Sequence, residues 1–177
     1  MKITNYLLLS LFVFGLMSCS SDDDGNSDNG NPQEVTILGL WNASEMSING
    51  TVVEQNITSS FNGMATEMTG NDITFNEDHT LSGNSAPFNM EVHYVIEGLP
   101  PFTQTQEMNS AMAHEGTWSR EGNMLYIQEN GSTDREGFTI ETLNATTLKI
   151  SGDQNSTSVG DDFPAGSTFN VTITYRR

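Results

Sequence analysis

The feature that most constrains the fold is an alternation of apolar and polar residues with a period of two. It is clearest near the end of the chain, where every second residue is large and apolar: Phe169, Val171, Ile173 and Tyr175. Because successive side chains of a β-strand point to opposite faces, this spacing predicts a strand with one buried face. Shorter runs of the same kind recur at 73–75, 92–96, 138–140 and 148–150.

Short turn signals separate many of these runs. They are Asn49-Gly50, Glu121-Gly122-Asn123, Asn130-Gly131 and Gly152-Asp153. Asparagine and glycine tolerate the positive φ angles of tight hairpin turns. The segment FNEDHTLSG is predicted to be a hairpin with Glu77 and Asp78 at its turn. Several short strands with close turns favour an antiparallel sandwich or barrel over a parallel fold.

Two segments do not follow this alternation. In residues 59–70 the apolar side chains have helical spacing, which predicts a short helix or a long loop: Phe61, Met64, Ala65 and Met68. Residues 99–114 contain Pro100-Pro101 and then a further apolar pattern, and they are expected to form an irregular insertion. Methionines at such spacing usually pack in a core.

The first residues are predicted to be a targeting segment. The apolar run from Leu7 to Met17 is shorter than the roughly twenty residues that a membrane-spanning helix needs. Lys2 precedes this run and small residues follow it, which is the order found in a secretory signal peptide. Residues 1–18 are therefore left out of the expected fold.

The residues Leu16-Met17-Ser18-Cys19 resemble the lipobox of bacterial lipoproteins. In that family the cysteine thiol is lipidated, cleavage makes the cysteine the first residue, and acyl chains such as palmitate hold the protein at a bilayer. The chain has one cysteine and hence no disulfide partner for it, which favours the lipobox over an ordinary signal peptide with an incidental cysteine. The resemblance implies that Cys19 is the membrane attachment.

An acidic cluster follows this cysteine. It resembles the surface-export signal of Bacteroidetes lipoproteins, and its charges would also keep a tether extended: Ser21, Asp22, Asp23 and Asp24. An EF-hand calcium loop that begins at Asp22 is rejected, because its sixth and twelfth positions are Ser27 and Gln33 in place of glycine and glutamate.

Residues 19–34 are expected to be a disordered acidic linker, since aliphatic and aromatic residues are absent from Cys19 to Gln33. Residues 35–177 are then long enough for one domain with a sizeable core. The chain carries a formal charge of −17, which repels nucleic acid and anionic headgroups. We expect a monomeric body without a nucleic-acid partner, anchored by lipid to the cell outer membrane and exposed at the surface.

Gly39-Leu40-Trp41 resembles the G-x-W motif of the lipocalins, and the chain ends in Tyr175-Arg176-Arg177. In that family the tryptophan lies across the closed end of the barrel, and an arginine from near the last strand stacks on it. Such a contact contributes about 0.5–2 kcal/mol. Alternation puts Arg177, and not Arg176, on the face of Tyr175. The expected barrel-closing motif is therefore Gly39, Trp41 and Arg177.

Further segments resemble, in order, the lipocalin-like domain common among Bacteroidetes lipoproteins: LGLW, ITFNEDHTLSG, GTWSREGNMLYI, IETLNATTLKIS and NVTITYRR. The resemblance covers about residues 36–177 and implies an all-β fold, an antiparallel up-and-down β-barrel, in which Gly116-Thr117-Trp118 begins a mid-barrel strand. Small barrels either fill themselves with side chains or hold one small ligand. We expect a small hydrophobic ligand. The alternative is a filled barrel that binds a protein or glycan through its loops.

The sequence gives no support for a catalytic site. His79, His93 and His114 form none of the strong zinc spacings, and the G-x-S-x-G nucleophile motif is absent. Glu91 and His93 share one face of a predicted strand and are expected to face solvent. Among 23 acidic residues, two at catalytic separation would be chance unless they shared a cleft with shifted pKa values. We expect a protein without enzymatic activity, metal or cofactor.

Overall fold

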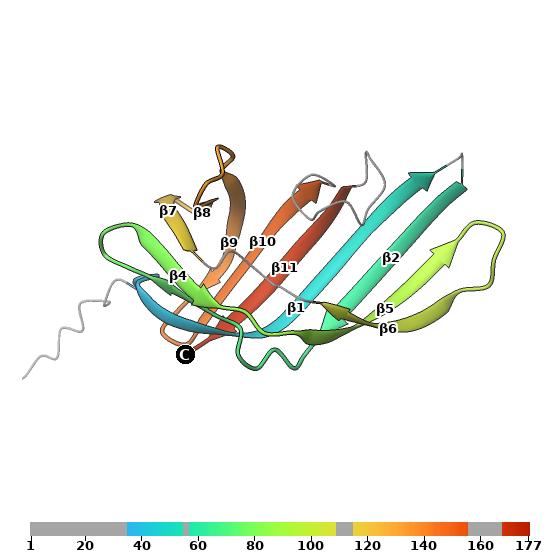
Figure 1. The fold of residues 1–177 in the computed structure, drawn as a ribbon, viewed down its shortest axis with the longest axis horizontal. Helices are drawn as coiled ribbons and strands as arrows, with labels where there is room; N and C mark the ends of the chain where they lie inside the picture. Colours follow the sequence, from blue (N-terminus) through green and yellow to red (C-terminus); the bar gives the residue numbers. More distant parts are fainter. Residues whose placement is uncertain (1–34, 55–56, 109–114, 156–167) are drawn as a thin grey trace, which may run out of the picture. The chain divides into compact units, whose positions relative to one another are not determined.

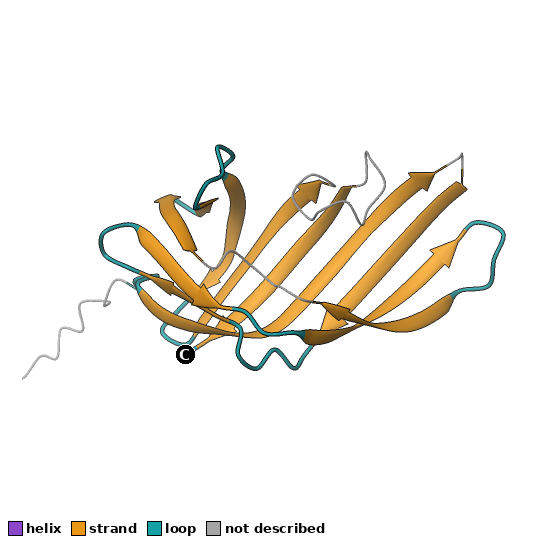
Figure 2. Ribbon diagram, in the orientation of Figure 1, coloured by secondary structure: helices purple, strands orange, loops and turns teal. Residues whose placement is uncertain are grey.

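The computed structural model describes residues 35–54, 57–108, 115–155 and 168–177, and the regular elements in these ranges are strands joined by turns and loops (Figure 2). The strands are β1 (Gly39–Glu54), β2 (Ile57–Ala65), β3 (Asp72–Phe75), β4 (Thr80–Asn84), β5 (Phe88–Ile96), β6 (Phe102–Met108), β7 (Glu115–Glu121), β8 (Met124–Glu129), β9 (Glu136–Leu143), β10 (Thr147–Asn155) and β11 (Thr168–Arg176). Within the described ranges, no helix has the length and apolar character needed to cross a bilayer.

The strands form an antiparallel sheet that closes on itself. Eight of them make a ring in the order β11-β10-β9-β8-β7-β4-β3-β1, and β1 pairs again with β11. One edge of β1 pairs first with β3 and then, further along, with β2. Strands β2, β5 and β6 therefore continue the wall beyond the short strands of the ring (Figure 1). The prediction of an all-β, antiparallel up-and-down barrel is confirmed.

The sheet contains eleven strands but the ring only eight, because some strands that run one behind the other along the barrel are separated by a break in the chain's pairing. β2 and β3 both line β1, β4 pairs with β3 while β5 pairs with β2, and β7 pairs with β4 while β6 pairs with β5. Each of these pairs of segments follows one path along the wall. Neighbouring paths are consecutive in the chain, which is the up-and-down order.

Asn71 stabilises the connection between β2 and β3, where the first of these paths is interrupted. Its side chain is buried, its amide donates to the carbonyls of Met68 and Ala86 at 3.2 and 3.1 Å, and its Oδ1 accepts from the Ala86 amide at 3.2 Å. Its own carbonyl accepts from the Ala43 amide at 2.8 Å. Buried backbone groups need partners, and one asparagine supplies them where the ladder stops.

The two ends of the barrel differ. The closed end holds the start of β1, the end of β11 and the turns at 76–79, 122–123 and 144–146. The open end holds the turns at 97–101 and 130–135. Large apolar side chains fill the interior: Trp41, Tyr175, Phe75, Phe138, Ile73, Met90, Leu125, Leu148, Ile150, Ile173 and Val92 are the largest fully buried ones.

The hairpin predicted in residues 75–83 is confirmed, as are the turns at 121–123 and 130–131. β3 pairs with β4 across the first turn, where the Thr80 amide and hydroxyl both donate to Asp78. These hydrogen bonds lower the pKa of Asp78. Gly122 and Gly131 have φ angles of 63° and 86°, a conformation that favours glycine.

The prediction of a helix or long loop in residues 59–70 is wrong for residues 59–65, which belong to β2 (Ile57–Ala65), whereas residues 66–70 form a loop with a turn. Burial alternates along β2, with Phe61, Gly63 and Ala65 inside. Gly63 adds nothing to a hydrophobic pattern, while Met64 points outward with 58% of its surface exposed. A Cβ at Gly63 would lie 2.7 Å from Met90 Sδ, so the packing of the interior requires glycine at this position. Because glycine is not a large apolar residue, the alternation of β2 does not appear in the sequence.

The irregular insertion predicted in residues 99–114 is also wrong in part. β6 covers Phe102–Met108, whereas residues 109–114 lie outside the described ranges. Most side chains of β6 are exposed. An exposed strand at the end of a sheet shows no apolar alternation, so the hydrophobic pattern could not indicate it.

Two of the predicted turns are interior positions of strands. Asn49-Gly50 lies within β1, and Gly152-Asp153 lies within β10. A Cβ at Gly152 would approach Phe138 Cδ1 to 2.7 Å. Gly50 pairs with a phenylalanine on each side. These glycines leave space for aromatic rings inside the barrel. From the sequence alone, a glycine with this role looks the same as a glycine in a turn.

Candidate functional site

The closed end is sealed by one tryptophan and the backbone around it. Trp41 is fully buried, and its indole N–H donates to the Ile37 carbonyl at 2.7 Å. The Arg177 Cζ lies 3.9 Å from the centroid of the Trp41 ring, and Arg177 also donates to the Leu38 carbonyl. Gly39 has a φ of +102°, which favours glycine where the chain turns into β1.

The structure therefore brings together the three residues expected to close the barrel, Gly39, Trp41 and Arg177. Arg176 lies on the other side of β11, where its Nη1 donates to Thr147 Oγ1 at 2.5 Å. The arrangement supports the fold and leaves no room at this end for a ligand to reach the ring of Trp41.

Tyr175 lies in the same core, and its hydroxyl has no hydrogen-bond partner among the described residues. Burial raises the pKa of this phenol. A buried hydroxyl without a partner costs about 1–3 kcal/mol of desolvation. We predict that Tyr175→Phe leaves the free energy of urea unfolding unchanged or raises it by about 1 kcal/mol.

The control for this substitution is Tyr94→Phe. The Tyr94 hydroxyl donates to Gln106 Oε1 at 3.3 Å in a part of the barrel that solvent reaches, so its loss should give no gain. A loss of stability for Tyr175→Phe larger than for Tyr94→Phe would show that the Tyr175 hydroxyl has a favourable partner.

An aromatic row crosses the interior face near the open end. Strand register places five residues opposite one another on neighbouring strands: Phe169, Gly50, Phe61, Tyr94 and Phe102. Directly opposed residues of an antiparallel pair share one face of the sheet. Because Phe61 and Phe169 are buried in the core, the whole row faces the interior.

The rings of this aromatic row meet in two pairs. Phe61 and Phe169 lie 6.2 Å apart between ring centroids at 56°, on either side of Gly50. Tyr94 and Phe102 stack at 5.1 Å and 21°. Separations of this size are those of favourable aromatic pairs. Gly50 carries no side chain that would fill the space between the first two rings.

Solvent exposure rises along the aromatic row. Phe169 and Phe61 are buried, Tyr94 is half-buried, and Phe102 on β6 exposes 42% of its surface. In the described part of the chain, the outer edge of β6 has no strand beside it. Apolar surface that faces the interior and remains accessible is the property that a site for a small apolar molecule requires.

Glu136 begins β9 at the open end of the barrel, after the turn at 130–135. It pairs with Ile127, whose side chain is buried, so Glu136 is on the interior face of β9. The pairing of β9 with β10 ends at the Ser151–Thr139 pair, so Glu136 precedes the part of β9 that pairs with β10. Burial raises the pKa of Glu136, and the charge of Glu129 raises it further.

A raised carboxyl pKa makes the folded state bind its proton more tightly than the unfolded state. Stability then falls as the pH rises from the ordinary glutamate value of about 4.3 through the raised value. We predict that the stability difference between Glu136→Gln and the parent chain grows across this interval and then levels off. Urea unfolding at several pH values measures it. An equal rise for the exposed control Glu91→Gln would contradict the assignment.

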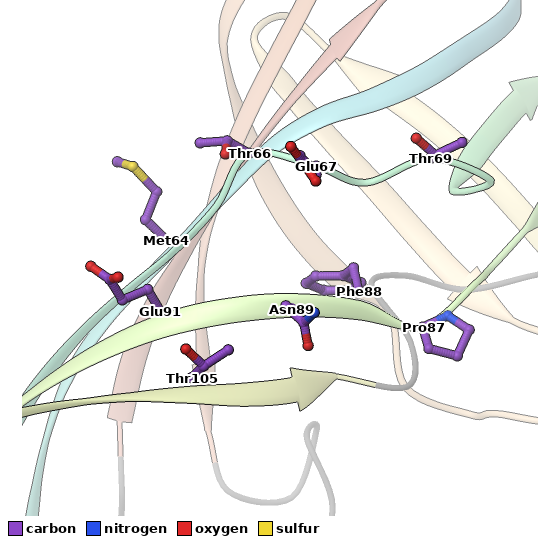
Figure 3. A pocket seen from close by; sticks show the side chains of 9 residues that line it. All are labelled: Met64, Thr66, Glu67, Thr69, Pro87, Phe88, Asn89, Glu91 and Thr105. Atoms are coloured by element: carbon purple, nitrogen blue, oxygen red, sulfur yellow. The ribbon is translucent and has the colours of Figure 1, made fainter.

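The outer face of the barrel carries a polar cleft of about 430 Å³ where the wall strands are interrupted (Figure 3). Its lining consists of Met64, Thr66, Glu67, Thr69, Pro87, Phe88, Asn89, Glu91 and Thr105. Figure 3 shows Met64 and Glu91 on neighbouring strands, pointing the same way. They pair directly in the register of β2 and β5, which places both outside the barrel.

A second cleft of similar size lies at the closed end, between the segment that leads into β1 and the turn after β3. His79 and Trp118 line it, with ring centroids 5.1 Å apart. His79 has a φ of 65°, unusual for a residue other than glycine, and this conformation places its ring beside Trp118. The Trp118 indole donates to the Asn76 carbonyl at 3.2 Å, so the cluster holds the turn in place.

Other predicted residues lie apart from these places. Cys19 and the export-signal residues Ser21, Asp22, Asp23 and Asp24 are outside the described ranges. Glu91 and His93 face solvent, as predicted, and His93 Nδ1 lies 3.2 Å from Thr103 Oγ1. In the described ranges, no three His, Cys, Asp or Glu side chains come together in a way that could hold a metal ion.

Sequence reasoning missed the aromatic row and Glu136. The row joins strands far apart in the chain, and two of those strands, β2 and β6, were not predicted. One member of the row could have been predicted: in β5, Tyr94 is two residues after the buried Val92, which indicates that both side chains point to the interior. The other members become neighbours only through the register.

The comparisons agree with this architecture. The lipocalin-like domain family matches residues 37–150, from just before the closing motif to the middle of β10. No curated protein and no solved structure matches the chain. The family match covers more than half of the sequence, and the structure has the closed antiparallel barrel of that family. The chain therefore belongs to the lipocalin-like domain family.

Proposed function

We propose that the protein is a Bacteroidetes-type lipoprotein of the cell envelope whose barrel binds a small hydrophobic molecule at its open end, without catalysing a reaction. The aromatic row carries this proposal. It presents apolar surface that faces the interior and becomes accessible toward β6. The packing of the closed end supports this placement, because Trp41 and Tyr175 are buried there.

Fluorescence of the uncharged probe N-phenyl-1-naphthylamine tests the binding site. The full chain with Cys19→Ala should bind it saturably, and Phe102→Ala should weaken the binding several-fold. Val53→Ala is the matched control, since Val53 is 64% exposed but belongs to the outward-facing set of β1. Equal affinities for the two variants, or the absence of saturable binding, would contradict the proposed site.

The lipid anchor rests on the lipobox at Cys19 and on the acidic, apolar-poor linker behind it. Several acyl chains on one residue give durable attachment, at about 0.8 kcal/mol per buried methylene. We predict that Cys19→Ala yields a protein without acyl mass that is released from the membrane fraction, whereas Ser20→Ala stays attached. Mass spectrometry and membrane flotation measure both. Persistent membrane association of Cys19→Ala would contradict the anchor, and with it the outer-membrane location.

The outer cleft favours a second candidate, recognition of a protein or glycan on the surface of the barrel. Its polar lining around the exposed Met64 resembles an interaction surface more than a site for an apolar ligand. Pull-down from outer-membrane extract separates the two candidates. A partner lost with Met64→Lys and retained with Phe102→Ala supports the outer cleft, and the reverse result supports the open end.

A further inference from the structure

The interior faces of β2, β5 and β6 decide which apolar molecule the open end accepts, given the proposed function above. Phe61 in β2 and Met90 and Val92 in β5 are buried, which identifies the interior side of these strands. Residues that pair directly across neighbouring strands share that side. On β6 the register with β5 gives the interior set, which alternates with outward-facing residues: Phe102, Gln104, Gln106 and Met108.

The two glutamines of this set place uncharged polar groups beside the aromatic row. Gln104 pairs with the buried Val92, and Gln106 pairs with the buried Met90. Tyr94, a member of the row, donates from its hydroxyl to Gln106 Oε1 at 3.3 Å, and its ring stacks on Phe102. Both glutamines are exposed, so a ligand that lies on the rings of Tyr94 and Phe102 also meets their amides.

Most of the hydrogen-bonding groups of these amides are not used by the protein. In the described part of the chain, the bond from Tyr94 to Gln106 Oε1 is the one that involves either glutamine side chain. The Gln106 amide nitrogen and both ends of the Gln104 amide can therefore donate to and accept from a ligand. A neutral group that both donates and accepts, such as an amide or a hydroxyl, matches this pair.

The interior positions of β2, β5 and β6, all of which the structure describes, carry no charged side chain. The acidic residues and the histidine of these strands are Glu91, His93 and Glu107, and all three belong to the outward-facing set. The sequence also contains no lysine or arginine between Lys2 and Arg120, a span that includes β1 to β6. A carboxylate bound on this face would lose water without gaining a cation, which is unfavourable.

The basic residues from Arg120 onward are held away from this face. Three of them have partners at the closed end, and the other two lie outside the barrel, because Lys149 and Tyr126 alternate with buried residues of β10 and β8. The partners are the Gly122 carbonyl for Arg120, the ring of Tyr126 for Arg135, Glu141 for Lys149, Thr147 for Arg176 and the ring of Trp41 for Arg177.

A ligand of the open end therefore meets accessible rings and neutral amides. Its apolar part would lie on the aromatic row, where Tyr94 and Phe102 are accessible, and its polar head would lie at the neighbouring glutamines. We infer that the open end binds a neutral amphiphile, an amide or alcohol with an apolar tail, whose head exchanges hydrogen bonds with Gln104 and Gln106. Fatty acids, which are anions at neutral pH, are then poor ligands of this barrel.

Displacement of N-phenyl-1-naphthylamine from the Cys19→Ala chain tests this preference. Decanamide and decanoate have the same tail and nearly the same shape, and they differ in the charge of the head. At neutral pH, decanamide should displace the probe at a concentration about tenfold lower than decanoate. The comparison is made at high salt, where the long-range repulsion between the acidic chain and an anion is screened, and below the concentrations at which either compound forms micelles.

Two variants locate the head of the ligand. Gln104→Leu and Gln106→Leu keep the size of the side chain but remove the amide, so each should weaken displacement by decanamide about three- to tenfold. Neither should change the affinity for the probe or displacement by decanoate. Thr103→Val is the matched control, because it also makes a polar position of β6 apolar, but Thr103 pairs with the solvent-facing His93 on the outer face. Circular dichroism checks that all three variants are folded.

The outcomes keep this inference separate from the proposed function. If the probe does not bind saturably, the proposed ligand site fails and the inference fails with it. If the probe binds and decanoate competes as well as decanamide, the site stands and the inference is overturned. A preference for decanamide that persists in both glutamine variants, or that falls equally in Thr103→Val, also overturns it. A preference that falls in the glutamine variants alone supports it.

Discussion

Replacing Trp41 with alanine is expected to lower the free energy of unfolding by about 3–5 kcal/mol. The side chain is fully buried in the closed end, where its indole donates to the Ile37 carbonyl and carries the Arg177 guanidinium on its face. The substitution leaves a cavity and removes the surface on which Arg177 is stacked. Urea unfolding followed by circular dichroism measures the loss.

Leu40→Ala is the matched control, because this neighbouring side chain is 50% exposed. Its expected change is below about 1 kcal/mol. Arg177→Ala should lose about 0.5–2 kcal/mol, and the loss in the double variant with Trp41→Ala should be smaller than the sum, since the two residues share one contact. Similar losses for Trp41→Ala and Leu40→Ala would contradict the closing role.

Gly116→Ala is expected to destabilise the barrel by about 3 kcal/mol, at the upper end of the range for overpacking. A Cβ at this position would lie 2.2 Å from the carbonyl oxygen of Gln128 and 3.0 Å from its carbonyl carbon. Both atoms belong to the backbone of β8, so no side-chain rotation relieves the clash. The two strands would have to separate where β7 pairs with β8.

Gly137→Ala provides the control for this prediction. It is also a strand glycine, but a Cβ there would first meet the ring of Tyr126 at 3.3 Å, a side chain that can shift. The expected loss is below about 1 kcal/mol. Thermal unfolding of both variants compares them, and an equal shift would show that the backbone contact of Gly116 is not the cause.

The sequence predicts those parts of the fold whose physical cause is local. Alternation in residues 169–175 predicts the strand in which Ile173 and Tyr175 are buried. This prediction needs no other part of the chain, because the period of two arises within a single strand. The same alternation predicted the face on which Arg177 lies. The turn at Glu77 and Asp78 could also be predicted, since the hydrogen bonds that hold it join residues two apart.

The parts that could not be predicted depend on pairing between distant residues. Gly50 suggests a turn when it is considered alone, and only the neighbouring strands show that its missing side chain makes space for Phe61 and Phe169. β6 is hidden for a different reason. It ends the described sheet, so its side chains need not be apolar. The aromatic row combines both difficulties.

The pairing of β1 with β11 determines the order in which such a chain can assemble. Most other neighbours along the wall are consecutive strands, which can form as hairpins within microseconds, whereas β1–β3, β2–β5 and β4–β7 join strands separated by only one or two others. The final seam joins residues separated by about 130 positions, as in the bond from the Ser44 hydroxyl to the Thr174 carbonyl, and must wait for a long loop to close. Folding speed should therefore respond to the seam, and linking the two strands through a new short connection would accelerate it.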